Sequence, residues 1–246
     1  MDIETLKQLA DWNPPDVKSI IDKGILLPQT RLILYGPYKS WKSLSVMDIA
    51  FCIAEGRPWH TYDTSPCRVL LIQIEIPRRE FRKRVLKYAN GNNSWPEQLL
   101  FCTQPYLKLD HSFGMTAMEN ALRQYHPEVL IIDPIYKVIS GDISNSYDVM
   151  KFLDNMDILM NKYGCAIILV SHTRKPIMTV DGPMDRGTDE LMGSSYLANW
   201  CDTAIGVKVL SDAAIQYEFA TMRHAEEELK PLRVKVNRTK LRFSVM

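Results

Sequence analysis

The stretch LILYGPYKSWKSLSVMDIA, residues 32–50, decides how the chain folds. It opens with a short apolar run, typical of a strand buried on both faces, and closes with the apolar spacing of a helix. Between them, Gly36, Lys42 and Ser43 stand where the phosphate-binding loop G-x-x-x-x-G-K-[ST] requires them. Trp41 replaces the second glycine of that loop, so the first question is whether the loop still binds a nucleotide.

The loop has the chemistry of a triphosphate site. A turn between a strand and a helix directs several backbone N–H groups at one anion, and the helix dipole adds positive potential there. At these positions Lys42 is expected to contact the β- and γ-phosphates of ATP, and the Ser43 hydroxyl to bind Mg²⁺. The predicted nucleotide-binding residues are Gly36, Pro37, Tyr38, Lys39, Ser40, Trp41, Lys42, Ser43 and Leu44.

Trp41 is compatible with such a loop. The usual glycine permits a backbone conformation that costs other residues about 1–2 kcal/mol. Trp41 keeps the backbone N–H, which is the group that binds phosphate. We therefore expect its indole to point away from the anion, towards the adenine side or a neighbouring subunit, and Trp41→Gly to retain ATP binding.

Apolar and amphipathic segments alternate along the chain, which predicts an α/β fold with a mainly parallel sheet and helices on both faces. Strands are predicted at 31–35, 68–75, 99–104, 128–134 and 165–172, and helices at 43–55, 77–89, 115–125 and 148–163. Strands at 203–209, 215–222 and 232–243 would extend the sheet with an antiparallel part. Short helices at 3–9 and 16–23 would form an N-terminal helical extension, residues 1–28, before a main domain of residues 29–246.

Polar residues follow three of these strands at the edge where open α/β sheets bind ligands. Asp133 is suited to the Mg²⁺ water shell, and Glu75 to orienting or deprotonating the attacking water. His172 is suited to sensing the γ-phosphate. A surface glutamate that ends a strand, or a structural histidine, would explain Glu75 or His172 equally well. Their shared edge with the loop of residues 36–43 favours the catalytic interpretation.

The composition argues against a strongly basic nucleic-acid binder, a disulfide-stabilised protein and a membrane protein. The 246 residues carry a net charge of +1, which gives no overall attraction to nucleic acid, so any such contact must come from local patches. Five cysteines without C-x-x-C spacing predict reduced, buried thiols. The polar N-terminus and the absence of an apolar run near 18 residues predict a cytoplasmic protein, bacterial or phage-encoded in its host, without membrane contact.

Several motifs together resemble a known family. These are GPYKSWKS, LIQIE, LIIDP, SHTRK, GSSYLANWCDTAIGV and KVNRTK, in this order. They resemble the RecA-like P-loop ATPase core, closest to the branch of RepA-type hexameric helicases and related phage AAA ATPases. The resemblance covers about residues 25–242. It implies ATP and Mg²⁺ as ligands, Glu75 as catalytic glutamate, Asp133 as the Mg²⁺-associated aspartate and His172 as γ-phosphate sensor.

The resemblance also implies an assembly. Members form rings or filaments, with a hexamer favoured here, and the nucleotide lies between subunits. Lys235 and Arg238 match the basic pair that reaches a neighbour's phosphates, although charges protecting an edge strand explain them too. Arg186 is an alternative finger. The segments 141–147 and 174–193 match DNA-facing loops, whereas the basic helix RREFRKR, residues 78–84, is expected to be a solvated face.

Three functions remain open on the sequence. The first is an ATP-driven helicase, translocase or recombination ATPase on single-stranded DNA, with a loader or another replication or recombination protein as a possible partner. The second is a nucleotide-dependent assembly or regulatory ATPase without DNA work, which the near-neutral charge and the acidic residues of 181–190 favour. The third is an inactive scaffold, supported by Trp41 and opposed by the joint presence of Lys42, Ser43, Glu75 and Asp133.

Overall fold

The computed structural model describes residues 3–13, 17–173, 178–179, 182–183 and 195–246. Its helices are α1 (Leu6–Asp11), α2 (Lys42–Glu55), α3 (Arg78–Asn92), α4 (Ser112–Tyr125), α5 (Ile135–Val138), α6 (Ser146–Tyr163) and α7 (Ser195–Trp200). The strands of the first half are β1 (Arg31–Gly36), β2 (Val69–Gln73), β3 (Leu99–Cys102), β4 (Val129–Asp133) and β5 (Ala166–His172). The later strands are β6 (Met178–Thr179), β7 (Gly182–Pro183), β8 (Thr203–Ser211), β9 (Ala214–Met222), β10 (Leu232–Asn237) and β11 (Arg242–Val245).

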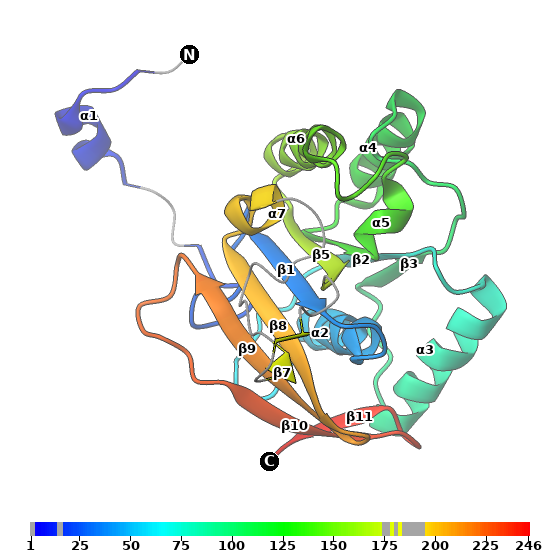
Figure 1. The fold of residues 1–246 in the computed structure, drawn as a ribbon. Coiled ribbons are helices and arrows are strands. Elements are labelled where there is room, and N and C mark those ends of the chain that lie inside the picture. The colour runs from blue at the N-terminus through cyan, green and yellow to red at the C-terminus, as the bar shows by residue number, and fades with distance from the viewer. Residues whose placement is uncertain (1–2, 14–16, 174–177, 180–181, 184–194) are drawn as a thin grey trace.

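One nine-stranded sheet organises the molecule, in the order β11-β10-β9-β8-β1-β5-β4-β2-β3 (Figure 1). The strands from β8 to β3 in that order are parallel, and β9, β10 and β11 add antiparallel pairs. β1 lies between β5 and β8, so the loop after β1 opens at the centre of the sheet. The predicted α/β architecture with an antiparallel C-terminal part is confirmed.

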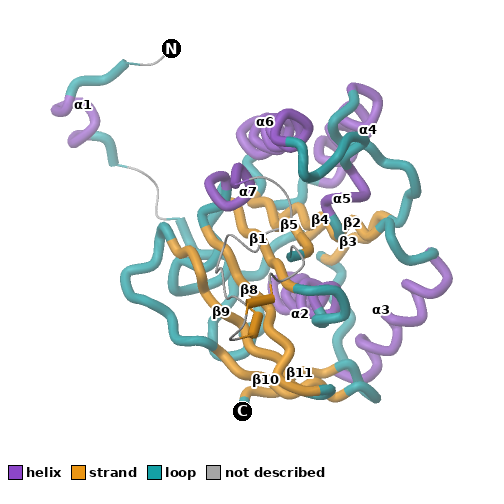
Figure 2. Tube along the Cα trace, viewed as in Figure 1, coloured by secondary structure: helices purple, strands orange, loops and turns teal. Residues whose placement is uncertain are grey.

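Two helical layers cover the sheet (Figure 2). Alternate residues of a central strand face opposite layers: Leu32 and Leu34 pack with α2 and α3, whereas Ile33 and Tyr35 pack with α4 and α6. Because α2 lies under the sheet with nearly all its residues buried, the start of this helix is fixed directly behind the loop that precedes it.

The N-terminal part differs from the prediction. α1 forms within the predicted segment 3–9, and Thr5 caps it in a capping box with Gln8. The described part of the predicted helix 16–23 is not helical; it forms a turn in which Ile21 pairs with Leu26. Both residues are buried in the core beside α2, so burial of this segment against the domain prevails over its helical spacing. The domain boundary at residue 28 stays a prediction.

The C-terminal part also differs. The segment 232–243 was predicted as one strand but forms β10 and β11 with a tight turn between them. The Asn237 side chain makes this turn, because its Oδ1 accepts hydrogen bonds from the backbone N of Thr239 and of Lys240, both at 3.0 Å. Gly91, in α3, lets the turn approach closely: a Cβ there would lie 2.3 Å from the Lys240 carbonyl oxygen.

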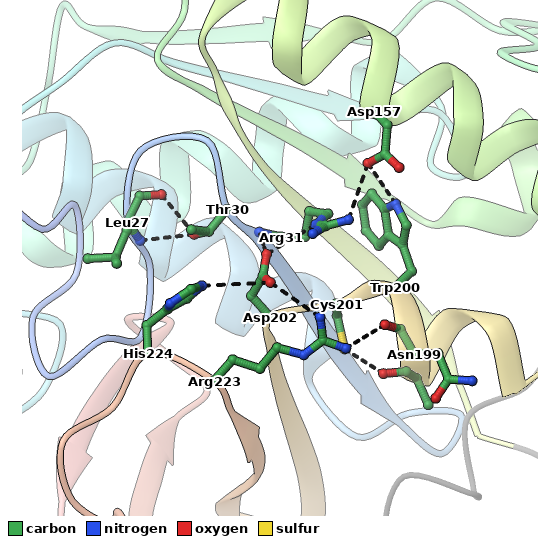
Figure 3. Close-up of polar contacts among 11 residues, drawn as sticks. Leu27, Thr30, Arg31, Asp157, Asn199, Trp200, Cys201, Asp202, Arg223 and His224 are labelled. Atoms are coloured by element: carbon green, nitrogen blue, oxygen red, sulfur yellow. Dashed lines mark hydrogen bonds and ion pairs between the residues drawn. The ribbon is translucent and has the colours of Figure 1, made fainter. Parts of the chain in front are cut away.

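Asp202 joins the ends of several strands at the opposite end of β1 from the loop (Figure 3). Its Oδ2 accepts hydrogen bonds from the backbone N of Arg31 at 3.0 Å and from Arg31 Nε at 3.1 Å. Arg223 and His224 approach its Oδ1, each at 3.7 Å. Trp200 Nε1 donates to Asp157 at 2.9 Å, which ties α7 to α6. This network fixes β1 and β8 side by side.

Among the residues that the structure describes, none of the helices combines the length and the apolar character needed to cross a bilayer.

Candidate nucleotide site

A cavity of about 680 Å³ opens at the carboxyl ends of the parallel strands. It brings together the phosphate loop, Glu75, Asp133 and His172, which the sequence placed at one edge of the sheet. The other residues that contribute to its wall are Ile76, Arg84, Val209, Ser211, Asp212, Arg238 and Leu241. A larger, open and mostly apolar cavity of about 1080 Å³ lies between α3, β3 and α4, and it shares Glu75 and Ile76 with the first. The smaller cavity is the candidate site because it holds the convergent charged groups.

The Lys42 side chain is buried against the phosphate loop of residues 36–43. Its Nζ donates hydrogen bonds to the Pro37 carbonyl oxygen at 2.6 Å and to Ser40 Oγ at 3.3 Å. Burial lowers the pKa of Lys42 to about 8, while Asp133 and Glu75 oppose this shift. A buried ammonium ion with only neutral hydrogen-bond partners is poised to bind an anion, since a phosphate would compensate its desolvation.

Trp41 adopts the backbone conformation that a glycine usually provides. It precedes α2 with φ 68° and ψ 11°, in the left-handed region. Its carbonyl oxygen accepts a hydrogen bond from Ser45 Oγ at 3.0 Å, and Tyr217, from β9, donates to that Oγ at 2.8 Å. The Tyr217–Ser45–Trp41 chain holds the strained residue from inside the core.

The Trp41 indole is half-buried and packs against the hydrophobic core. The Arg238 guanidinium lies over it, with Cζ 5.2 Å from the ring centroid. Arg238 also donates to the Asp212 carbonyl oxygen from Nε at 3.1 Å and from Nη2 at 2.5 Å. The indole thus forms cavity wall on the side of the β10–β11 turn, in contact with a basic residue of the same chain.

Asp133 and Ser43 form the acidic side of the site. Asp133 ends β4 and is buried. Burial raises its pKa to about 6 and nearby Glu75 adds to the rise, whereas a hydrogen bond from Ser43 and the charge of Lys42 lower it. A hydroxyl and a carboxylate beside a phosphate loop are oxygen donors of the kind that Mg²⁺ prefers, so these two residues fit the predicted metal role. The described residues contain no preformed cluster of three or more His, Cys, Asp or Glu side chains for a metal.

Glu75 lies two residues beyond the end of β2, not within the strand as predicted. Its Oε1 accepts a hydrogen bond from the Tyr136 hydroxyl at 2.8 Å. The Tyr136 ring centroid lies 5.6 Å from that of His172, and the Tyr38 ring centroid lies 6.4 Å from it. Burial and the charge of Lys42 lower the pKa of His172, so its imidazole is neutral at pH 7.

The remaining predicted functional residues lie away from this cavity or outside the described residues. Lys235 is exposed on β10 and does not line the cavity. Of the segment 141–147 predicted to face DNA, residues 141–145 form a largely exposed loop, and Ser146 and Tyr147 begin α6. Arg186 and most of the segment 174–193 lie outside the described residues.

Comparison with known proteins identifies the family. The model of the family described as "AAA domain" matches residues 3–178, which include the phosphate loop, Glu75, Asp133 and His172. The chain belongs to this AAA-domain family. Comparison with curated protein sequences found no match.

A solved structure shares the fold of this AAA-domain protein. That structure, described as an ATPase domain, aligns with a TM-score of 0.68 and 10% sequence identity, over 89% of this chain and 85% of that one. At this identity the likeness shows the fold alone, and that fold is RecA-like. The resemblance to RecA-like P-loop ATPases expected from the sequence is therefore confirmed.

Two residues of this site in the AAA-domain protein were not predicted from the sequence: Arg84, which lines the cavity, and Tyr136, which contacts the cavity residue Glu75. Arg84 belongs to the basic helix expected to be a solvated face, yet it lines the cavity and its charge acts on Asp133. The run of five basic residues gave no sign of which one would face inward. Tyr136 lies in α5, a four-residue helix without apolar periodicity. Its position three residues after Asp133 was the one available signal.

Proposed function

We propose that this AAA-domain protein is an oligomeric ATPase that hydrolyses ATP and acts on single-stranded DNA, as a replicative helicase, translocase or recombination ATPase. One observation carries the hydrolytic part of this proposal. Lys42 and Ser43, Glu75, Asp133 and His172 come from four separate segments of the chain and all line one cavity at the mouth of the phosphate loop.

The proposed reaction is in-line attack of water on the γ-phosphate. Lys42 stabilises charge on the β- and γ-phosphates, while Glu75 orients the water and accepts its proton. The exposed carboxylate of Glu75 is free of ion pairs among the described residues, and its hydrogen bond from Tyr136 restricts its orientation. His172, neutral and next to Tyr136, is placed to report loss of the γ-phosphate.

Ser43 and Asp133 would hold Mg²⁺ together with the nucleotide. When bound, the ion would neutralise negative charge on the phosphates. The raised pKa of Asp133 reflects a carboxylate that is buried without a full positive partner, and a cation beside it would remove that penalty.

The proposed assembly is a ring or filament, with a hexamer favoured, in which a basic residue of one subunit approaches the ATP of the next. Lys235 is an exposed candidate on β10, and Arg186 is a second candidate outside the described residues. The loop of residues 141–145, which begins three residues after the end of α5, supports the proposed DNA contact, because α5 carries the Tyr136 that contacts Glu75. A loader or another replication or recombination protein is the proposed external partner.

The alternative is a nucleotide-dependent assembly or regulatory ATPase without direct DNA work. The net charge of +1 favours it, since single-stranded DNA binders usually present a basic groove. Both functions use the same nucleotide site and differ in what the hydrolysis drives.

The experiment is ATP turnover by the wild-type protein and by Lys42→Ala, with and without single-stranded DNA. Loss of turnover in Lys42→Ala, with stimulation of the wild type by DNA, supports the first function. Turnover and assembly that DNA leaves unchanged favour the alternative. Equal turnover by both proteins would show that the phosphate loop is not the site.

A further inference from the structure

We propose that Arg238 binds the phosphate chain of the nucleotide held by its own subunit, and that Trp41 positions Arg238 for this contact. The proposal deepens the function above and rests on it, since it concerns the same ATP site. It departs from the expectation that Arg238 reaches the nucleotide of a neighbour.

The first support is where the guanidinium lies. Arg238 lines the same cavity as Lys42 and Ser43 of its own chain. Two contacts fix it there: the indole face of Trp41 at 5.2 Å and the paired hydrogen bonds to the Asp212 carbonyl oxygen. These bonds use the N–H of Nε and one of Nη2, so within the described part of the chain the two N–H groups of Nη1 and the second of Nη2 are left to reach an anion.

The second support is that the β10–β11 turn, which carries Arg238, packs against α3 of the same chain. Asn237 shapes the turn, and the absence of a side chain at Gly91 allows the Lys240 carbonyl to lie against α3. Leu241 packs on the core beside α2. Arg238 and its turn are thus held by Trp41, Asp212 and α3 of the same chain, on the side of that chain's own cavity.

The third support is charge balance. Four cationic side chains line the cavity, namely Lys39, Lys42, Arg84 and Arg238, against three carboxylates, namely Glu75, Asp133 and Asp212. Without Arg238 the two signs are equal. Arg238 is therefore one of the four cations on which the net positive charge of the cavity depends, and that charge favours a triphosphate.

Trp41 supports Arg238 in a way that the usual glycine of this loop could not. A glycine there would leave Arg238 without an aromatic face, whereas Trp41 offers one at the residue next to Lys42. The residue that departs from the motif thus adds a second cation to the phosphate site, beside the lysine that the motif itself supplies.

The test begins with equilibrium binding of ATP to the full chain, with pyrophosphate and tripolyphosphate as competitors that carry no base. Arg238→Ala is expected to weaken ATP and both competitors about tenfold. Arg242→Ala removes the same charge from the same hairpin outside the cavity and is expected to bind like the wild type. Equal binding by Arg238→Ala and Arg242→Ala would overturn the proposal, while the hydrolysis lost in Lys42→Ala would still support the function.

Trp41 is tested through Arg238. Trp41→Phe keeps an aromatic face and is expected to bind ATP within about twofold of the wild type, whereas Trp41→Leu is expected to bind severalfold more weakly. In an Arg238→Ala background, Trp41→Leu should add no further loss, because the group it positions is gone. Full additivity of the two losses would refute the positioning role.

Mixed assemblies separate a contact within one subunit from a contact between subunits. Arg238→Ala and Lys42→Ala are combined under conditions where subunits exchange, which a wild-type plus Lys42→Ala mixture verifies. If Arg238 acted on a neighbour, roughly a quarter of the interfaces in an equal mixture would join an intact loop to an intact Arg238 and regain hydrolysis. We expect turnover no higher than the average of the two variants, and a gain above it would overturn the proposal.

Discussion

The Tyr136 hydroxyl donates a hydrogen bond to Glu75 Oε1 at 2.8 Å. Burial and the neighbouring carboxylate of Glu75 raise the pKa of Tyr136, so the hydroxyl keeps its proton and remains the donor at neutral pH. The two residues come from segments on either side of α3 and α4, and the bond links the proposed catalytic carboxylate to α5, just before the exposed loop of residues 141–145.

Tyr136→Phe tests this link. Removal of the hydroxyl frees the Glu75 carboxylate to rotate, so we expect kcat for ATP hydrolysis to fall about five- to tenfold while KM stays nearly unchanged, which corresponds to one lost hydrogen bond of about 1 kcal/mol. Steady-state kinetics measure both constants. Tyr106→Phe removes a hydroxyl from a residue that is 92% exposed and should alter neither. A rise in KM without a change in kcat would mean that Tyr136 binds substrate rather than orienting Glu75.

Trp41→Gly tests the loop itself. Glycine relieves the left-handed backbone at φ 68°, worth about 1 kcal/mol, but loses the indole packing and the support of Arg238. We expect ATP binding to be retained and weakened severalfold, as measured by calorimetry. Complete loss of binding would show that the indole contacts the nucleotide directly.

The pH dependence of ATP binding follows from Lys42. Its pKa is about 8 in the free protein, and a bound phosphate raises it, so the charged form is the one that binds. The dissociation constant should stay nearly constant from pH 7 to 8 and then rise, by up to about tenfold per pH unit. In the free protein the lowered pKa has the opposite effect on folding: the free energy of unfolding should increase as the pH rises from about 8 towards 10.5.

Lys42→Arg is the matched control for this prediction. A guanidinium stays charged throughout the range, so the variant can bind more weakly than the wild type but should lack the rise above pH 8. Parallel curves for the two proteins would assign the pH dependence to another group.

Asp202→Asn tests the network that joins β1 to β8. The substitution keeps the shape but removes the charge that Arg31, Arg223 and His224 share, and Asp202 is nearly buried. We expect a loss of about 2–3 kcal/mol in the free energy of unfolding, measured by urea denaturation. Glu227→Gln breaks the exposed pair with Lys23 at 3.2 Å and should cost much less, because solvent screens this pair. Equal losses in the two variants would mean that burial of Asp202 gives its ion pairs no additional strength.

The sequence predicted the central sheet well because its strands are continuous apolar runs followed by polar residues. That pattern located Asp133 and His172 at the correct ends of β4 and β5, whereas Glu75, predicted as the last residue of its strand, lies two residues past β2. The helix expected at 16–23 was wrong where the structure describes it, since Ile21 and Leu26 are buried by pairing rather than by helical spacing.

Other features depend on contacts between distant segments. The sequence Asn237-Arg238-Thr239 is typical of a turn. Nothing in the sequence, however, indicates that this turn packs against Gly91. Arg84 and Tyr136 reach the site only because α3 and α5 fold against the ends of β2 and β4. No spacing within either segment distinguishes these residues from their neighbours.

Gly91 has a consequence for the size of the nucleotide cavity. A side chain at this position would meet the Lys240 carbonyl and push the turn, with Arg238 and Leu241, away from α3. Gly91 itself does not line the cavity. The aperture through which a nucleotide enters can therefore be adjusted, in evolution or by engineering, from a remote helix position, without altering any group that meets the ligand.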